Sequence, residues 1–522
     1  MHRVYQEKAE EVANALCGNV FNLATVLCCD AGNNFEDLER VAWTHQSVLF
    51  TKLADWLKVS APVVSRRAAL AFSHGFLSIL SHRTATEQDA NNKVPAHPFL
   101  CRNWKDNFTY GQALSENLIN ILKNSVDYGE RMSAMKSLAA LFSLSGSSVK
   151  YAVDDNGFVD FCVQKLHNLG CKHYDTKSTS VNKKNTSTFL TETLSYMELL
   201  SCVFYVSSEA KTLALQNNFP DVLHKIFGWW TCFPDFSLLH TYIEALLNFT
   251  EEFPEGALAL TLTSNVVGVG PRRVPTQQSI FMEIIGILEK ELSNVEHNPN
   301  LKTVEYIFEL LKNICFVQEC RNILLKSSVV LFLKKLHNQE TKKWGSKQNT
   351  VKTNYLDFLV HASAHSDVQT CITKIPEGLE ILVQVMEADT PPASTLALKV
   401  LRNLCFQQAN KGRLLSENMF MPSLSNKLSQ SSDLSEIEHA AVSLWALVAN
   451  YEKGRLFAKK AYCGESITKA LTRVKKMEQT SSADSEEVTR VISLLETVQK
   501  LIGTTNPAKQ AMHSRSSSLS QV

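Results

Sequence analysis

Glycine and proline are scarce in this chain, and their scarcity bears directly on the fold. The 522 residues include 19 Gly and 14 Pro, together about 6%, where roughly 12% is average for proteins. Sheets and barrels need turns that are rich in these two residues. The composition therefore favours helices. Because a single core rarely grows beyond about 250–300 residues, the length favours several domains or an elongated repeat array.

An excess of charge of one sign is also missing. The chain has 53 Lys and Arg against 52 Asp and Glu. A domain that binds duplex nucleic acid usually carries a basic excess, so we do not expect nucleic acid as the main partner. No run approaches the roughly 18 apolar residues of a membrane span, and residues 1–8 are too charged to form the apolar core of a signal peptide.

Motifs of disulfide, metal and catalytic chemistry are missing from the sequence as well. The 13 Cys are dispersed in apolar helical contexts without a C-x-x-C pair, as expected of free thiols in a reducing compartment. No G-x-S-x-G, H-E-x-x-H or Walker-type loop occurs. His361 and His365 are spaced i, i+4, but two imidazoles without a third ligand do not make a zinc site. We therefore expect no catalytic residue, no metal ion and no cofactor.

What the chain does contain is helical periodicity and internal repetition. Apolar residues in 303–316 recur at i, i+3, i+4 and i+7, which is typical of one helix face. The segment 310–316 (LLKNICF) matches 400–406 (VLRNLCF) at an offset of 90 residues, twice a period in the armadillo/HEAT range of about 40–47. A following segment, 410–414 (NKGRL), is echoed at 452–456 (EKGRL). The pattern predicts that the motif leucines and isoleucines are buried between repeats: Leu311, Ile314, Leu401 and Leu404.

The repeated L-x-N-[LI] helix with its following polar turn resembles the armadillo-like α-solenoid family. In that family an Asn at this point bridges backbone groups of the neighbouring repeat. Asn248, Asn313 and Asn403 occupy the position, whereas His361, Cys202 and Ala446 depart from it. The resemblance implies an all-α, armadillo/HEAT-like right-handed α-solenoid with polar inter-repeat loops. We expect irregular helical repeats or a cap at 1–130, armadillo-like repeats at 131–475, a C-terminal capping helix at 476–502 and a disordered tail at 503–522.

A narrower resemblance rests on 398–406 (LKVLRNLCF), 410–415 (NKGRLL) and 447–450 (LVAN). These segments are similar to the C-terminal region of rotatins, which are very large armadillo-like proteins of centrioles and ciliary basal bodies. The resemblance implies a non-enzymatic protein-binding scaffold in centriole assembly or elongation and in ciliogenesis, located in the cytoplasm at the centrosome and basal body. It also implies that the chain is a part or a short isoform of a longer protein.

Two other functions remain open at this point. The same fold serves armadillo-like cytosolic regulators of small GTPases or of ubiquitin pathways, because such modules recognise partners through the same helical surface. A helical metalloenzyme built around His361 and His365 is the second alternative. In the scaffold hypothesis the partner-facing residues lie beside the motif asparagines, and they are Asn248, Glu309, Lys312, Asn313, Lys399, Arg402 and Asn403.

The last residues of the chain carry two short motifs. Arg515 precedes Ser518 by three residues, which suits a basophilic kinase and makes Ser518 a candidate phosphorylation site. The final Ser-Gln-Val fits the S-x-V pattern that PDZ domains bind by strand addition and capture of the carboxylate. Both motifs also fit a plain polar tail.

Overall fold

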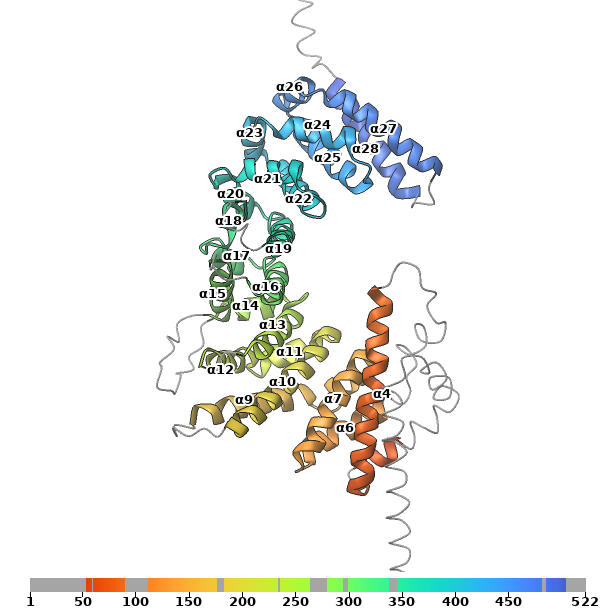
Figure 1. Cartoon of the computed structure of the whole chain (residues 1–522), viewed down its shortest axis with the longest axis vertical. Coiled ribbons are helices and arrows are strands. Elements are labelled where there is room, and N and C mark those ends of the chain that lie inside the picture. The colour runs from red at the N-terminus through yellow and green to blue at the C-terminus, as the bar shows by residue number, and fades with distance from the viewer. Residues whose placement is uncertain are drawn as a thin grey trace, which may run out of the picture. The chain divides into compact units, whose positions relative to one another are not determined.

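The computed structural model describes residues 53–58, 60–89, 111–175, 183–232, 235–262, 279–293, 299–337, 345–480 and 485–503. Every regular element within these ranges is a helix, which confirms the all-α, solenoid-like repeat fold predicted from the sequence (Figure 1). The chain divides into two compact units, Met1–Phe281 and Met282–Val522. The predicted tail, except for Gly503, lies outside the described residues.

The first unit repeats a pattern of one long, one short and one long helix. Its described helices are α4 (Val63–Asp89), α6 (Gly111–Asn124), α7 (Tyr128–Leu144), α8 (Gly146–Asp154), α9 (Phe158–Asp175), α10 (Lys183–Val206), α11 (Ser208–Gln216), α12 (Phe219–Cys232), α13 (Phe236–Thr250) and α14 (Pro254–Ala259). The long helices α4, α7, α10 and α13 pack in this order, each against the next.

The second unit continues the same pattern. Its described helices are α15 (Ile280–Ser293, which begins in the first unit), α16 (Leu301–Ile314), α17 (Gln318–Leu324), η1 (Val329–Leu331), α18 (Phe332–His337), α19 (Ser346–Ala362), α20 (Ser366–Lys374), α21 (Gly378–Ala388), α22 (Ala393–Phe406), α23 (Gln408–Ser416), α24 (Phe420–Gln430), α25 (Leu434–Val448), α26 (Glu452–Lys460), α27 (Cys463–Thr480) and α28 (Ser485–Gly503). None of the described helices is long and apolar enough to cross a membrane.

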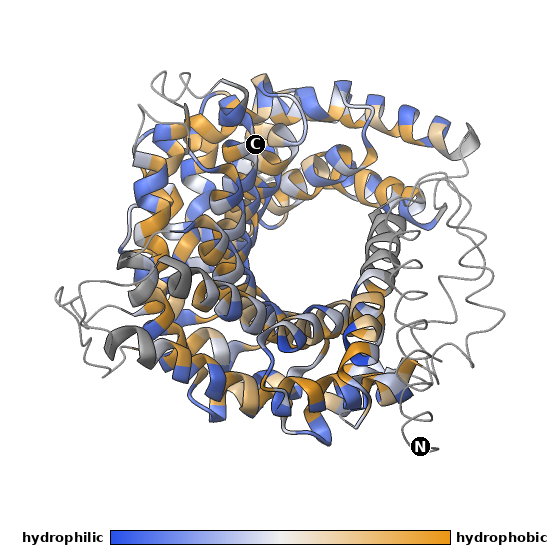
Figure 2. Cartoon of the chain, turned by 60° about the horizontal axis from the view of Figure 1, so that its bottom comes forward, coloured by the Kyte–Doolittle hydropathy of each residue, from blue (hydrophilic) through white to orange (hydrophobic). Residues whose placement is uncertain are grey.

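The helices that carry the Asn motif or its equivalent in the second unit are α16, α19, α22 and α25, and we call them the motif helices. They pack side by side in chain order, and α28 packs against α25. Apolar and polar residues share the surface of each helix (Figure 2), so a helix has a face to bury. Leu311, Ile314, Leu401 and Leu404 are all buried, as predicted.

The turn after a motif helix is held by an arginine of the short helix that follows. The Arg321 guanidinium on α17 donates from Nη1 to the carbonyl oxygens of Cys315 and Phe316, at 2.9 Å each. These carbonyls lie at the end of α16, where no further intrahelical donor remains. From Nε the same group donates to Asp367 Oδ2 at 2.9 Å, at the start of α20 in the next repeat. One side chain therefore joins a helix end to the neighbouring repeat.

Seven cysteines in the part of the chain that the structure describes are free thiols, and five of them are buried, as the sequence predicts. Burial raises the pKa of the Cys202 and Cys315 thiols to about 12. Burial raises the pKa of Cys162 and Cys405 as well. These side chains therefore pack as small apolar groups and stay protonated at neutral pH.

The two copies of the K-G-R-L sequence sit differently in their helices. Leu414 is the seventh residue of α23, whereas its counterpart Leu456 is the fifth residue of α26. A shift of two residues turns a side chain by about 200° around the helix axis. Leu414 is accordingly 0% exposed and Leu456 54% exposed.

The turn before α26 produces this shift. Only Gln407 separates α22 from α23, whereas α25 and α26 are separated by residues 449–451, with Asn450 at a φ of 55°. Asn tolerates this left-handed conformation better than most residues. Gly454 is thereby brought against α25, and a Cβ atom there would collide with the carbonyl oxygen of Leu447. At Gly412 in α23 a Cβ would meet nothing within 4 Å.

We expect Leu401→Ala to lower the free energy of unfolding by about 2–5 kcal/mol, because it leaves a cavity between stacked helices. Leu456→Ala removes an exposed side chain and should change it by less than about 0.5 kcal/mol. Urea unfolding followed by circular dichroism measures both. An unchanged unfolding midpoint in the Leu401 variant would contradict the stacking.

Gly454→Ala and Gly412→Ala form a matched pair of helix substitutions. Alanine at 412 should stabilise the protein by up to about 1 kcal/mol, because glycine weakens a helix interior. Alanine at 454 should destabilise it, because α26 must move away from the Leu447 carbonyl. Thermal unfolding of the two variants decides the matter, and a stabilised Gly454 variant would show that the α26 register is wrong.

Candidate protein-binding surface

The structure divides the predicted partner-facing residues of the second unit into two groups. Glu309, Lys312 and Asn313 lie on α16, and Lys399, Arg402 and Asn403 lie on α22. The motif helix α19 packs between these two helices. Asn248 lies on α13 in the first unit. Ser518, Arg515 and the C-terminal Ser-Gln-Val lie outside the described residues.

Two of the motif asparagines bridge neighbouring repeats, as the armadillo resemblance implies. Asn403 Nδ2 donates to the carbonyl oxygen of Val360 and to Ser363 Oγ, both at 3.0 Å and both at the end of α19. Asn248 Nδ2 donates to the carbonyl oxygen and the Oγ of Ser201 on α10, at 3.2 and 2.8 Å. The amide nitrogens thus hold the solenoid together. Asn313 is half-buried on α16.

Lys312 is engaged within the second unit. Its Nζ lies 2.6 Å from Asp357 Oδ2 on α19 and 2.7 Å from Glu309 Oε1 on its own helix. Burial by itself lowers the pKa of Lys312, but the hydrogen bonds and charges of the two carboxylates outweigh it and raise the pKa overall. The ammonium group therefore couples α16 to α19, while the Glu309 side chain stays 47% exposed.

Arg402 is likewise tied to its neighbours. Its Nε and Nη2 donate to Asn403 Oδ1 at 3.3 and 3.0 Å, and its Nη1 lies 3.2 Å from His439 Nδ1 on α25. Since a guanidinium only donates, His439 Nδ1 accepts and the ring carries its proton on Nε2, which lies 3.3 Å from Ser435 Oγ. Burial lowers the pKa of Arg402, opposed by the charge of Glu438.

Burial controls the charge state of His439. Burial lowers the pKa of His439 to about 4, assisted by the charges of Arg402 and Lys399 and opposed by Asp433 and Glu436. Lys399 forms no ion pair with any residue that the structure describes. The surface of α22 therefore presents net positive charge beside a neutral imidazole.

Exposed aromatic residues stand at the ends of the motif helices, and the sequence reasoning missed them. Phe316 and Phe406, the last residues of the two matching motifs, are 60% and 53% exposed. The Phe406 ring lies 6.4 Å from the ring of Trp445 on α25, and the Phe316 ring lies 5.8 Å from that of His365. The signal was present, because the motif repeats a Phe at the position where its helix ends.

The histidine pair does not share one helix. α19 ends at Ala362, so His361 lies in its last turn, where Nδ1 is 2.9 Å from the carbonyl oxygen of Asp357. His365 precedes α20 as its N-cap residue, and its ring packs against Phe316. Across the described ranges no three His, Cys, Asp or Glu side chains are grouped in a way that could hold a metal ion.

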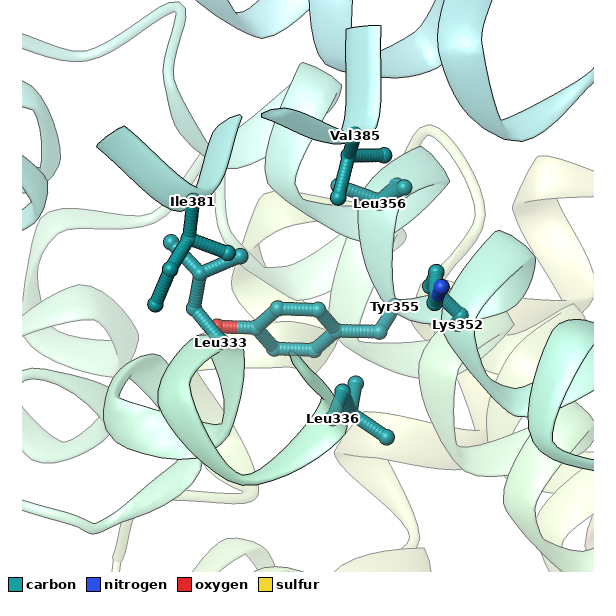
Figure 3. A pocket seen from close by; sticks show the side chains of 7 residues that line it. All are labelled: Leu333, Leu336, Lys352, Tyr355, Leu356, Ile381 and Val385. Carbon is teal, nitrogen blue, oxygen red and sulfur yellow. The ribbon is translucent and has the colours of Figure 1, made fainter. Parts of the chain in front are cut away.

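A pocket lies between α18, α19 and α21, and Figure 3 shows its lining. The Tyr355 side chain crosses it and donates from its hydroxyl to the carbonyl oxygen of Val330 at 2.8 Å. Lys352 at its edge binds Asp389 at 2.8 Å. Its cavity volume of about 10 Å³ is far below the roughly 300–1,000 Å³ of small-molecule sites. Its remaining lining is aliphatic: Leu333, Leu336, Leu356, Ile381 and Val385.

We expect the stability of the protein to fall as the pH drops from about 6.5 to about 4, in part through His439. The folded state holds this imidazole neutral, so below pH 6.5 the unfolded chain takes up the proton first, at a cost of up to about 1.4 kcal/mol per pH unit. His439→Gln keeps an acceptor and a donor but does not titrate. The wild type should lose its advantage over this variant between pH 7 and pH 4.5 in urea unfolding, and a constant difference would contradict the neutral imidazole.

Comparisons with known proteins give the chain distant relatives. No family model matches it. It is 25% identical to human rotatin over 366 residues, which cover 69% of this chain and 16% of that protein. It is 22% identical to mouse rotatin over 419 residues, which cover 78% of this chain and 18% of that protein. The match thus spans less than a fifth of the length of either rotatin.

A crystal structure of an engineered protein matches the fold with a TM-score of 0.54 and 14% sequence identity, covering 88% of this chain and 99% of that one. This likeness concerns the fold alone. The similarity to rotatins agrees with the resemblance of 398–406 and its neighbouring segments. Most of the length of this chain is similar to a part of rotatin.

Proposed function

We propose that this chain is a non-enzymatic, protein-binding scaffold that acts in centriole assembly or elongation and in the organisation of ciliary basal bodies. The observation that carries the proposal is the similarity to human and mouse rotatin over 69% and 78% of the chain. A stack of helical repeats supports it, because such stacks offer extended binding surfaces. The partners are other proteins, centriolar ones among them, and the chain acts in the cytoplasm at the centrosome and basal body.

The motif helices of the second unit supply the binding surface in this proposal. The Glu309 side chain is exposed and Lys399 is half-buried, and Phe406 and Trp445 are exposed aromatic rings on adjacent helices. Aromatic side chains dominate the energetics of many protein interfaces. Arg402 and Asn403 join α22 to its neighbours α25 and α19 through hydrogen bonds.

We expect proximity labelling in ciliated cells to enrich centriole and basal-body proteins when the labelling enzyme is fused to the N-terminus. This placement leaves the C-terminal Ser-Gln-Val free. The double variant Lys399→Glu with Phe406→Ser should reduce the enrichment several-fold, because it reverses a charge and removes a ring from the surface. Lys326→Glu with Leu331→Ser alters an exposed lysine and an exposed leucine of another repeat and should leave the enrichment unchanged.

Any other labelling result would contradict at least part of the proposal. Diffuse labelling without centriolar proteins would remove the centriolar part of the proposal. Enrichment of a small GTPase or of ubiquitin-pathway components would favour the armadillo-like regulator instead. Thermal unfolding midpoints of both double variants show whether a loss of labelling comes from a loss of folding.

A further inference from the structure

We propose that the outward side of α26 is a separate docking surface that binds an acidic segment of a protein partner. We call it the α26 face and define it by Lys453, Leu456, Phe457, Lys460 and, just beyond the helix, Tyr462. This inference does not depend on the centriolar function proposed above, because it rests on contacts and charges of the second unit alone.

The residues of the α26 face lie on one solvent-exposed side of the helix. Lys453, Leu456, Phe457 and Lys460 follow the i, i+3, i+4, i+7 spacing and therefore share one side of the helix. Leu456 is 54% exposed and Phe457 39%. The Lys460 ammonium lies 5.8 Å from the centre of the Phe457 ring.

The exposure of the apolar pair follows from a fixed helix register. The equivalent pair in the preceding repeat, Leu414 and Leu415, is buried. In α26 the two-residue shift turns the pair outward and places Gly454 and Ala458 against the core instead. α26 cannot turn back without losing the close contact of Gly454 with the Leu447 carbonyl, which has room for no larger residue. In this register the apolar pair is exposed to water, where an unpartnered apolar patch is unfavourable.

The charge around the α26 face defines the chemistry of its partner. Residues 452–476 contain eight Lys or Arg against two Glu, in a protein whose formal net charge is only +1. Lys453, Lys459 and Lys460 form no ion pair with any carboxylate in the part of the chain that the structure describes. The complementary surface is anionic.

The arrangement favours a protein segment over a membrane or a nucleic acid. The apolar pair lies between lysines one turn away on either side, which matches a segment with an apolar side chain flanked by Asp or Glu. Arg473 donates hydrogen bonds to the carbonyl oxygens of Leu428 and Ser429, and Lys475 forms an ion pair with Glu496. On α26 itself Arg455 donates to the carbonyl oxygen of Val448, and three lysines are left, Lys453, Lys459 and Lys460. They are fewer than the clusters of about four to eight basic residues that mark anionic lipid binding.

The test selects peptides with the folded full-length chain from a phage-displayed library of random 16-residue sequences. We expect the selected peptides to be rich in Asp and Glu with at least one Leu or Phe, and to bind more weakly as salt rises. In fluorescence anisotropy the double variant Lys453→Glu with Lys460→Glu should raise the Kd of such a peptide about tenfold or more. Leu456→Ser with Phe457→Ser should raise it to a similar degree.

A matched control keeps the result interpretable. Leu331 is 52% exposed, and the Lys335 ammonium lies 5.3 Å from the Phe332 ring, so Leu331→Ser with Lys335→Glu changes the same features in another repeat. This variant should bind the peptide as the wild type does, and circular dichroism checks that all variants fold. Selected peptides without acidic enrichment, or an acidic peptide whose Kd neither α26 variant changes, would overturn the proposal. So would binding to phosphatidylserine vesicles or single-stranded RNA that is lost in the α26 variants while no acidic peptide binds.

Discussion

The structure depends on the packing of each motif helix between its two neighbours. A helix such as α22 has apolar residues on two flanks, and neither flank can leave water unless α19 and α25 lie against it. Leu401 and Leu404 are completely buried in this way. Because no repeat buries its own apolar surface, burial is a property of adjacent pairs, and the stability of the stack grows with each interface added. The short helices α20, α23 and α26 also pack in chain order, each against the next.

Polar side chains then fix the spacing between repeats. The Asn403 amide, the Arg321 guanidinium and the Lys312 ammonium each join one helix to the next through hydrogen bonds, at half-buried positions. Such bonds are stronger when one group is charged, and leaving one partner unpaired in a buried site is costly. They select one sliding position of the stacked helices, which the non-directional apolar contacts alone do not do.

The fold was predictable from the sequence because its signal is repeated. The spacing of Leu311, Ile314, Leu401 and Leu404 identifies one helix face in two copies, and each copy supports the other. The division at residues 130, 475 and 502 stays a prediction. The binding residues were harder to predict, because a charged residue beside a motif asparagine serves either a partner or the next repeat.

Particular residues show which features of the structure could not be predicted from the sequence. Lys312 and Arg402 look free in a sequence, yet the structure engages both between repeats, because their partners Asp357 and His439 are over thirty residues away in the chain. The second K-G-R-L copy was matched to the first by identity, but the residues before it add a left-handed turn at Asn450 that identity does not reveal. Only the local backbone path decides which way Leu456 points.

The buried thiols have a consequence for how the stack can be observed. Cys202, Cys315, Cys405 and Cys463 lie in or at the end of four different helices, α10, α16, α22 and α27, and each is largely shielded from water. A thiol reagent can reach such a side chain only when its own part of the structure opens. The rate at which each cysteine reacts would therefore report how often its own region of the solenoid opens locally while the other regions stay closed.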